Sequence, residues 1–408
     1  MSITDSRTAN LGSYDLIIVG AGPAGISTAL HLAKIAPELI PHTLILEKAR
    51  HPRHKLCGGG LLPDAEIILQ RLGLDCREVP HCDVDWAHFD YAGRGFRMRA
   101  EKKGALAFRT IRRHEFDAWL ADKACEKGFL IREDTAVKRI SASGEEMLLE
   151  TERGEYRARV VVGADGSNSV VRRYVVPHED THTARLLEIL TEPRPEKSFH
   201  DQANSYFDFM YVPQGILGYS WDFPALEAGQ PVRVRGIFDN NVYPLKKAIS
   251  LQAALADEFG RHGYRLDEYK LEGHPLRWFE PKSAFSAPQV LLAGDAAGAD
   301  ALFGEGISIA LGYGELAARA INDAFLSQDF GFREYRKSIL RSELGKSLGR
   351  RTWMAKLYYR LRSRLIQALV WRKLGWLVTW VMQTYMIGWA SREEKDCPPM
   401  PPRSTDLH

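Results

Sequence analysis

A glycine-rich turn near the start of the chain constrains the fold more than any other feature. Gly20-Ala-Gly22-Pro-Ala-Gly25 lies between the apolar run Asp15 to Gly20 and the helix-like run Gly25 to Ala36. A second apolar run, Thr43 to Leu46, follows and ends at Glu47. This order of elements predicts a β-α-β unit that opens an α/β domain.

The residue types in this unit suit the binding of a dinucleotide. Gly20, Gly22 and Gly25 allow a tight turn, close approach of the backbone to a pyrophosphate, and close packing of the helix on the sheet. The helix N-terminus offers unpaired N–H groups to the phosphates, and the Glu47 carboxylate can accept ribose hydroxyls. We therefore predict a dinucleotide site, with a tight structural turn as the alternative. The motif alone does not distinguish FAD from NAD.

A second glycine-rich stretch late in the chain favours FAD. Gly294-Asp295-Ala-Ala-Gly298 follows an apolar strand-like run and precedes Gly304-Glu-Gly306 and a helix-like run from Glu305 to Leu326. Asp295, at the end of a buried strand, can bind a ribityl hydroxyl, and a helix N-terminus near Gly304, Gly306 and Ile307 can face the pyrophosphate or a reduced flavin. NAD has no ribityl chain, so a second site of this kind favours FAD. The alternative is a strand-turn-helix whose small residues serve packing.

The chain has 408 residues, enough for more than one hydrophobic core, so we predict at least two domains. The glycine-rich elements lie in separate parts of the chain, which predicts one domain assembled from several segments. The predicted fold class is α/β, with a Rossmann-like FAD-binding domain, an α+β substrate domain built on a sheet, and C-terminal helices. The predicted division is 1–80, 105–182 and 279–345 for the FAD-binding domain, 81–104 and 183–278 for the substrate domain, 346–395 for the helical segment, and 396–408 for a disordered tail.

Composition and charge narrow the possible functions. The net charge is +3, but basic residues concentrate near the C-terminus, a distribution that argues against a nucleic-acid-binding protein. The five cysteines include no C-x-x-C pair and no zinc-like spacing, so we predict neither a disulfide framework nor a metal site. The polar start, Met1 to Tyr14, lacks the apolar region of a signal peptide and predicts a cytoplasmic protein.

Six stretches resemble the motifs of one flavoprotein family. They are the N-terminal glycine motif, His51-Pro-Arg-His-Lys-Leu-Cys57-Gly-Gly-Gly60-Leu, Arg113-His-Glu-Phe116-Asp117, Gly163-Ala-Asp165-Gly166-Ser, Gly218-Tyr219-Ser-Trp221-Asp-Phe223-Pro224 and Gly294-Asp-Ala-Ala-Gly298. Together they resemble the FAD-dependent geranylgeranyl reductase family, which shares the para-hydroxybenzoate hydroxylase fold with aromatic monooxygenases and flavin-dependent halogenases. The resemblance implies that Arg113 and Asp165 belong to the cofactor site.

The cysteine motif bears on the reaction. Gly58, Gly59 and Gly60 can let the backbone lie against a flavin ring, and the resemblance implies an active-site role for Cys57. A thiol with an ordinary pKa of about 8.5 is mostly protonated at neutral pH, so Cys57 is a candidate proton donor. The alternative is a buried small hydrophobic residue.

The aromatic motif bears on the substrate. Tyr219, Trp221 and Phe223 alternate along the chain, so in a strand they share one face. We predict that they line a flat apolar pocket suited to a polyprenyl chain or an aromatic ring, with Gly59 as a further substrate-binding residue. Tyr219 and Trp221 are also candidate catalytic residues. Ordinary core packing is the alternative. Halogenases of this fold carry W-x-W-x-I-P at the comparable place, so the motif alone does not define the reaction.

The C-terminal segment is basic and rich in tryptophan. It holds five of the nine tryptophans and ten basic residues, with no acidic residue between Glu343 and Glu393. The uncharged run Leu374 to Ala390 falls short of the roughly 20 apolar residues of a membrane-spanning helix. Three interpretations stay open: helices packed on the substrate domain or in a dimer, peripheral membrane contact through 346–392, or a spanning helix.

Taken together, these features predict an FAD-dependent oxidoreductase that reduces C=C bonds of an apolar, isoprenoid-type substrate. NAD(P)H is the expected electron donor, and the proton would come from Cys57, a tyrosine or water. A monooxygenase or halogenase of the same fold is the alternative enzyme. A flavin-containing module that binds a membrane or a partner is the alternative without catalysis.

Overall fold

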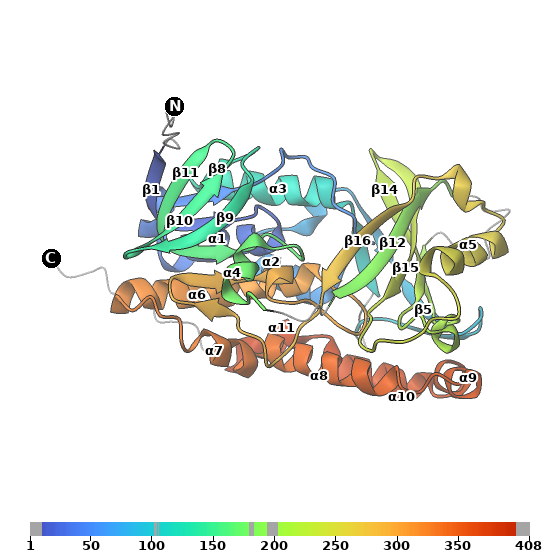
Figure 1. The fold of residues 1–408 in the computed structure, drawn as a ribbon. Coiled ribbons are helices and arrows are strands. Elements are labelled where there is room, and N and C mark those ends of the chain that lie inside the picture. The colour runs from blue at the N-terminus through green and yellow to red at the C-terminus, as the bar shows by residue number, and fades with distance from the viewer. Residues whose placement is uncertain (1–9, 102–103, 105, 179–182, 194–202, 397–408) are drawn as a thin grey trace, which may run out of the picture.

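The computed structural model describes residues 10–101, 104, 106–178, 183–193 and 203–396. The predicted disordered tail, 396–408, lies outside these residues except for its first position. The described chain forms two large sheets, with helices on the first sheet and a row of C-terminal helices along one side (Figure 1).

The first sheet contains the glycine-rich motifs. Its strands run in the order β17-β18-β11-β1-β2-β8, with β10 and β9 continuing it from β11. The bounds are β1 Asn10–Val19, β2 Thr43–Leu46, β8 Leu130–Arg132, β9 Val137–Ser143, β10 Glu146–Thr151, β11 Gly154–Gly163, β17 Ser286–Ala287 and β18 Val290–Leu292. The strands β18, β11, β1, β2 and β8 are parallel, and their apolar runs are buried because helices cover them. The three motifs that follow β1, β11 and β18 therefore meet at one edge.

The helices of this domain pack closely where small residues face each other. Helix α1 (Pro23–Ile35) lies against α6 (Ile307–Ser327), and a Cβ at Gly314 would come within 2.4 Å of the Ser27 hydroxyl. The β-α-β prediction is confirmed. Helix α6 begins two residues later than predicted because Gly306 is its N-cap. The other helices here are α2 (Pro63–Arg71), α3 (Arg113–Glu126) and α4 (Val170–Val175).

The second sheet has seven strands in the order β16-β12-β15-β14-β13-β5-β6. The bounds are β5 Trp86–Asp90, β6 Gly95–Met98, β12 Thr183–Thr191, β13 Asn204–Asp208, β14 Ser220–Glu227, β15 Gln230–Asp239 and β16 Glu272–Arg277, with α5 (Leu251–Arg261) beside the sheet. A small third sheet joins β3 (Gly60–Leu61), β7 (Phe108–Ile111) and β4 (His81–Val84). The predicted start of the substrate domain, residue 81, is the first residue of β4. This strand pairs with β7 of the small sheet and not with the second sheet.

The C-terminal segment packs inward on both domains. Its elements are α7 Tyr335–Arg341, α8 Glu343–Tyr358, α9 Arg364–Arg372, α10 Gly375–Val381, a π-helix Met382–Met386 and α11 Trp389–Asp396. Trp371 stacks on Phe209 of the second domain with ring centroids 3.8 Å apart. The uncharged run 374–390 is divided among α10, the π-helix and α11. Among the described residues, no helix is long and apolar enough to cross a membrane.

Candidate functional site

One cavity of about 390 Å³ runs between the two domains. Its walls include nearly all of the predicted site residues: Gly20, Gly22, Glu47, Cys57, Gly59, Arg113, Asp165, Tyr219, Trp221, Phe223, Asp295, Gly304, Gly306 and Ile307. Gly25 is the exception and does not line the cavity. A Cβ at Gly25 would lie 1.9 Å from the Gly20 carbonyl oxygen, so only glycine fits there. Gly25 therefore serves the turn between β1 and α1, and the other residues converge from distant parts of the chain.

Two helices begin at the polar end of this cavity. Gly22 is the N-cap of α1 and Gly306 is the N-cap of α6, and neither helix start has a side-chain cap. Their first backbone N–H groups are therefore available to an anion in the cavity. A Cβ at Gly22 would approach only the end of the Arg53 side chain, at 3.3 Å, so this glycine keeps open a space in front of the helix.

Glu47 is buried at the end of β2 and braces the glycine-rich turn. Its carboxylate accepts a hydrogen bond of 2.9 Å from the Ala21 N–H and lies 3.4 Å from the Arg53 guanidinium. Arg53 also pairs with Asp117 at 3.2 Å. Arg53 was not predicted as a site residue, although it lies inside the motif that contains Cys57.

Arg113 and Asp165 are less free to contact a ligand than the sequence suggests. Arg113, the first residue of α3, forms two hydrogen bonds of 2.7 and 2.8 Å with Asp117 one turn later. The Asp165 carboxylate accepts the backbone N–H groups of Val170 and Val171, at 2.6 and 3.3 Å. Asp165 thus supports the start of α4 and also lines the cavity, so its place in the cofactor site stays a prediction.

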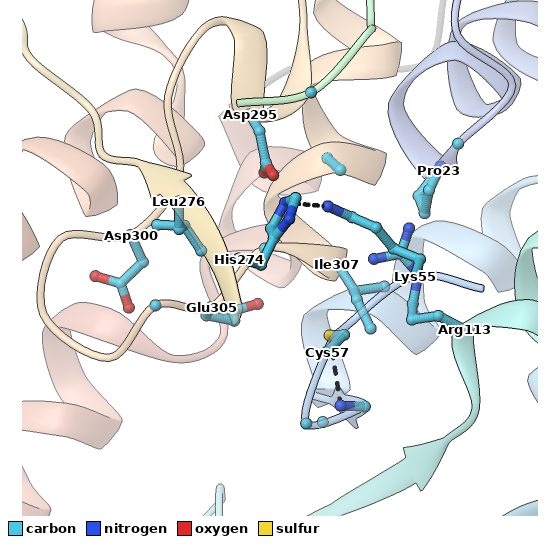
Figure 2. Close-up of a pocket in the computed structure, with 18 of the residues that line it drawn as sticks. Pro23, Lys55, Cys57, Arg113, His274, Leu276, Asp295, Asp300, Glu305 and Ile307 are labelled. Atoms are coloured by element: carbon cyan, nitrogen blue, oxygen red, sulfur yellow. Dashed lines mark hydrogen bonds between the residues drawn. The ribbon is translucent and has the colours of Figure 1, made fainter. Parts of the chain in front are cut away.

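Lys55 and His274 meet beside Asp295 (Figure 2). Lys55 comes from the loop before Cys57 and His274 from β16, and the Lys55 ammonium donates to Nε2 of His274. Burial, together with the Lys55 charge, lowers the pKa of His274 to about 4, so this imidazole is neutral at pH 7 and can accept that hydrogen bond. His274 was missed because it belongs to no motif, whereas Lys55 stands within one.

The loop 57–60 separates the polar end of the cavity from its aromatic end. Gly59 has φ +77°, and a Cβ there would lie 2.1 Å from the Ile111 carbonyl oxygen. A Cβ at Gly58 would press on the Phe223 ring at 3.1 Å. The half-buried Cys57 thiol accepts the Gly59 N–H at 3.4 Å. Glycines therefore let this loop fit between β7 and the aromatic wall, with Cys57 at the junction.

Aromatic side chains form the second end of the cavity. Tyr219, Trp221 and Phe223 lie along β14 and the residue before it. Phe207 of β13 packs against Tyr219 and Phe223, with ring centroids 5.2 and 5.0 Å apart. Phe108 of β7 lies edge-on to Phe223 at 5.5 Å. Phe207 and Phe108 were not predicted because their strands carry no motif.

The Tyr219 phenol is engaged and hard to ionise. Its hydroxyl donates to the Phe303 carbonyl oxygen. Burial raises the pKa of Tyr219 far above its usual value, and the negative charge of Asp300 raises it further. This side chain therefore stays protonated and is a weak acid. Among the described residues, the buried Trp221 Nε1 has no hydrogen-bond partner.

The C-terminal segment closes the aromatic end. Met382 and Met386 of the π-helix line the cavity. Arg351 of α8 is buried and pairs with Asp300 at 3.1 Å and Glu305 at 2.6 Å, while it donates to the Met386 carbonyl oxygen at 2.8 Å. Arg351 thus ties the loop before α6 to the π-helix.

Comparison with known proteins now identifies the family. A family model described as an FAD binding domain matches residues 13–233, more than half of the chain. The chain belongs to this FAD-binding family. The family assignment supports a flavin-dependent oxidoreductase, and the observed site fits FAD, since two uncapped helix starts and an open glycine turn face one cavity.

Three similar proteins extend this result. Digeranylgeranylglycerophospholipid reductase from Thermoplasma acidophilum is 26% identical over 377 residues, which cover 84% of this chain and 87% of the relative. The crystal structure of a geranylgeranyl bacteriochlorophyll reductase-like protein from the same organism matches with a TM-score of 0.76 at 22% identity, covering 96% of this chain and 98% of that one. Halogenase PltM, solved with phloroglucinol and FAD, matches with a TM-score of 0.64 at 17% identity, covering 89% and 80%. The two structural matches show that the fold is shared among these flavoproteins.

Proposed function

We propose that the protein is an FAD-dependent reductase that saturates C=C bonds of an apolar, isoprenoid-type substrate. The observation that carries the proposal is the continuous cavity, polar where two helices start and aromatic beyond Cys57. A long hydrocarbon chain suits walls made of phenylalanine, methionine and leucine side chains, because binding there removes its apolar surface from contact with water. The similarity to the digeranylgeranylglycerophospholipid reductase supports the same substrate class.

The polar end would hold FAD through the groups already in place. The N–H groups at the starts of α1 and α6 would bind the pyrophosphate. Glu47 would accept hydrogen bonds from the ribose hydroxyls, and Asp295 would accept them from the hydroxyls of the ribityl chain. Lys55 supplies a positive charge beside Asp295. When bound and reduced, FAD supplies a hydride. NAD(P)H is our proposed source of its electrons.

Reduction of a C=C bond also consumes a proton, because one carbon gains a hydride and the other gains H⁺. We assign this proton to Sγ of Cys57, which lies at the junction of the two ends of the cavity. Tyr219 is a poorer donor because its pKa is strongly raised and its hydroxyl already donates to Phe303. Tyr219, Trp221 and Phe223 would position the hydrocarbon chain.

A monooxygenase or halogenase is the second candidate, favoured by the structural similarity to halogenase PltM. The two candidates differ in their need for oxygen. Enzyme reduced under argon should be reoxidised when a lipid with unsaturated geranylgeranyl chains is added, and flavin absorbance would report this. If the flavin stays reduced until air is admitted, the reductase proposal fails. Flavin that neither reaction reoxidises would favour a binding module.

A further inference from the structure

The exposed hydrophobic side chains of this protein are concentrated on one segment. Eleven large hydrophobic side chains are exposed among the described residues, and nine of them lie between Trp353 and Tyr385. Among these nine, the most exposed are Leu365 at 84%, Trp376 at 71% and Trp353 at 64%. Scattered single hydrophobic residues are normal on a surface, whereas a concentrated set indicates an interaction site.

Helical spacing arranges these side chains in rows. Trp353 and Leu357 are four residues apart in α8, Leu365 and Leu369 in α9, and Trp376 and Trp380 in α10. Residues four apart lie on the same face of a helix. The three helices lie in a row along one side of the molecule, with α10 between α8 and α9 (Figure 1). We call the surface formed by the exposed side chains of these helices the tryptophan face; it comprises Trp353, Leu357, Leu365, Leu369, Trp376, Leu377 and Trp380.

The segment 344–392 carries a positive charge, but pairing with carboxylates makes that charge smaller than its composition suggests. Four of its ten basic residues pair with carboxylates: Lys346 and Arg392 with Glu343, Lys356 with Glu280, and Arg351 with Asp300 and Glu305. By contrast, Arg362, Arg364 and Lys373 form no ion pair within the described part of the chain. No acidic residue lies between Glu343 and Glu393, so this charge stays uncompensated by the segment itself.

The inner side of the same segment reaches the cavity. Met382 and Met386 are buried and line its aromatic end, while Trp380 and Tyr385 beside them are 45% and 40% exposed. A single turn of chain therefore separates the cavity from the tryptophan face. An apolar molecule held against this face would lie close to the cavity wall.

We propose that the tryptophan face docks on an anionic lipid bilayer. Indole and phenol rings favour the membrane interface, and unpaired basic side chains are attracted to anionic headgroups. A second copy of the chain fits this face less well, because symmetric contact would place the same uncompensated positive charges against each other. The proposal does not depend on the reaction proposed above, although it would bring a lipid substrate to the cavity.

Co-sedimentation of the full-length holoenzyme with vesicles tests this docking. With phosphatidylcholine vesicles containing phosphatidylglycerol, we expect binding that weakens at least tenfold when salt rises from about 0.05 to 0.5 M, because salt screens exposed charges. With phosphatidylcholine alone, we expect little binding. Equal binding to both vesicles, or none to either, would overturn the proposal.

Matched variants separate the tryptophan face from general stickiness. Trp376→Ser with Trp380→Ser, and separately Arg362→Gln with Arg364→Gln, should each reduce vesicle binding at least fivefold with flavin content unchanged. Leu130→Ser with Leu326→Ser removes exposed hydrophobic residues elsewhere, and Lys127→Gln with Arg153→Gln removes exposed charge elsewhere; both controls should bind like the wild type. Equal losses in the controls would contradict the proposal. So would a lipid-free dimer, seen by light scattering, that the tryptophan variant dissociates.

Discussion

The two ends of the cavity are built in different ways. At the polar end, backbone groups form the site: the N-caps Gly22 and Gly306 and the helix starts behind them. At the aromatic end, side chains from β7, β13, β14 and the C-terminal π-helix form the walls. The first end depends on local turn geometry, and the second depends on packing between segments far apart in the chain. Substitutions should therefore affect the two ends separately.

The largest effect is expected at the polar end. Gly22→Val would place a branched side chain in front of α1, where a Cβ meets only the end of the Arg53 side chain. The fold should persist, but bound flavin should fall by more than about tenfold because the backbone can no longer approach the pyrophosphate. The absorbance ratio of flavin to protein measures this. Gly260→Val, at an open position of α5, is the matched control and should keep its flavin. Full flavin in Gly22→Val would show that the polar end is misassigned.

A substitution at the aromatic end should lower the stability of the protein more than its affinity for flavin. Arg351→Met leaves the buried Asp300 and the half-buried Glu305 without their positive partner. Removing one member of a buried ion pair costs about 3–5 kcal/mol of unfolding free energy. Urea denaturation should show this loss, whereas Arg364→Met, on the exposed side of α9, should change stability little. Equal stability of the two variants would mean that α8 is not held by this pair.

The junction between the two ends should control the chemical step alone. Cys57→Ala should bind FAD normally but slow substrate reduction about 100-fold, a typical contribution of a general acid. Cys125→Ala removes an exposed thiol of α3 that does not line the cavity and should react at the wild-type rate. Stopped-flow reoxidation of the reduced enzyme gives both rates. An unchanged rate in Cys57→Ala would move the proton donor to another group.

A smaller effect, a pH-dependent change in stability, is expected from Glu188, which lies near the Cys57 backbone. Glu188 of β12 is buried near the Cys57 backbone, and burial raises the pKa of its carboxyl to about 7, against the opposing influence of Arg112. A raised carboxyl pKa means that the folded state binds more protons, so stability is lost as the pH rises from about 4.5 through 7. Relative to the wild type, Glu188→Gln should gain about 2 kcal/mol between pH 5 and pH 7. A pH-independent difference between the two proteins would contradict this assignment.

The same contrast explains what could be predicted from the sequence. The strand-turn-helix motifs were recognisable because glycines and acids at fixed spacing follow buried strands, and these motifs do meet at one edge of the first sheet. Phe207, His274 and Arg351 carry no such local pattern, and only the pairing of distant strands and helices brings them to the cavity. Asp165 stands in a motif, yet its carboxylate is used to cap α4, a contact that depends on the three-dimensional path of the loop.

The most direct test of the central claim is the mass of the product made by the reduced enzyme. Under argon, with an isoprenoid lipid as substrate, each reacted double bond should add two hydrogen atoms and no other element. The same product should form in air, and Cys57→Ala should make it slowly. A product that carries oxygen or halogen and forms only in air would contradict the reductase account and assign the cavity to an oxygen-dependent reaction.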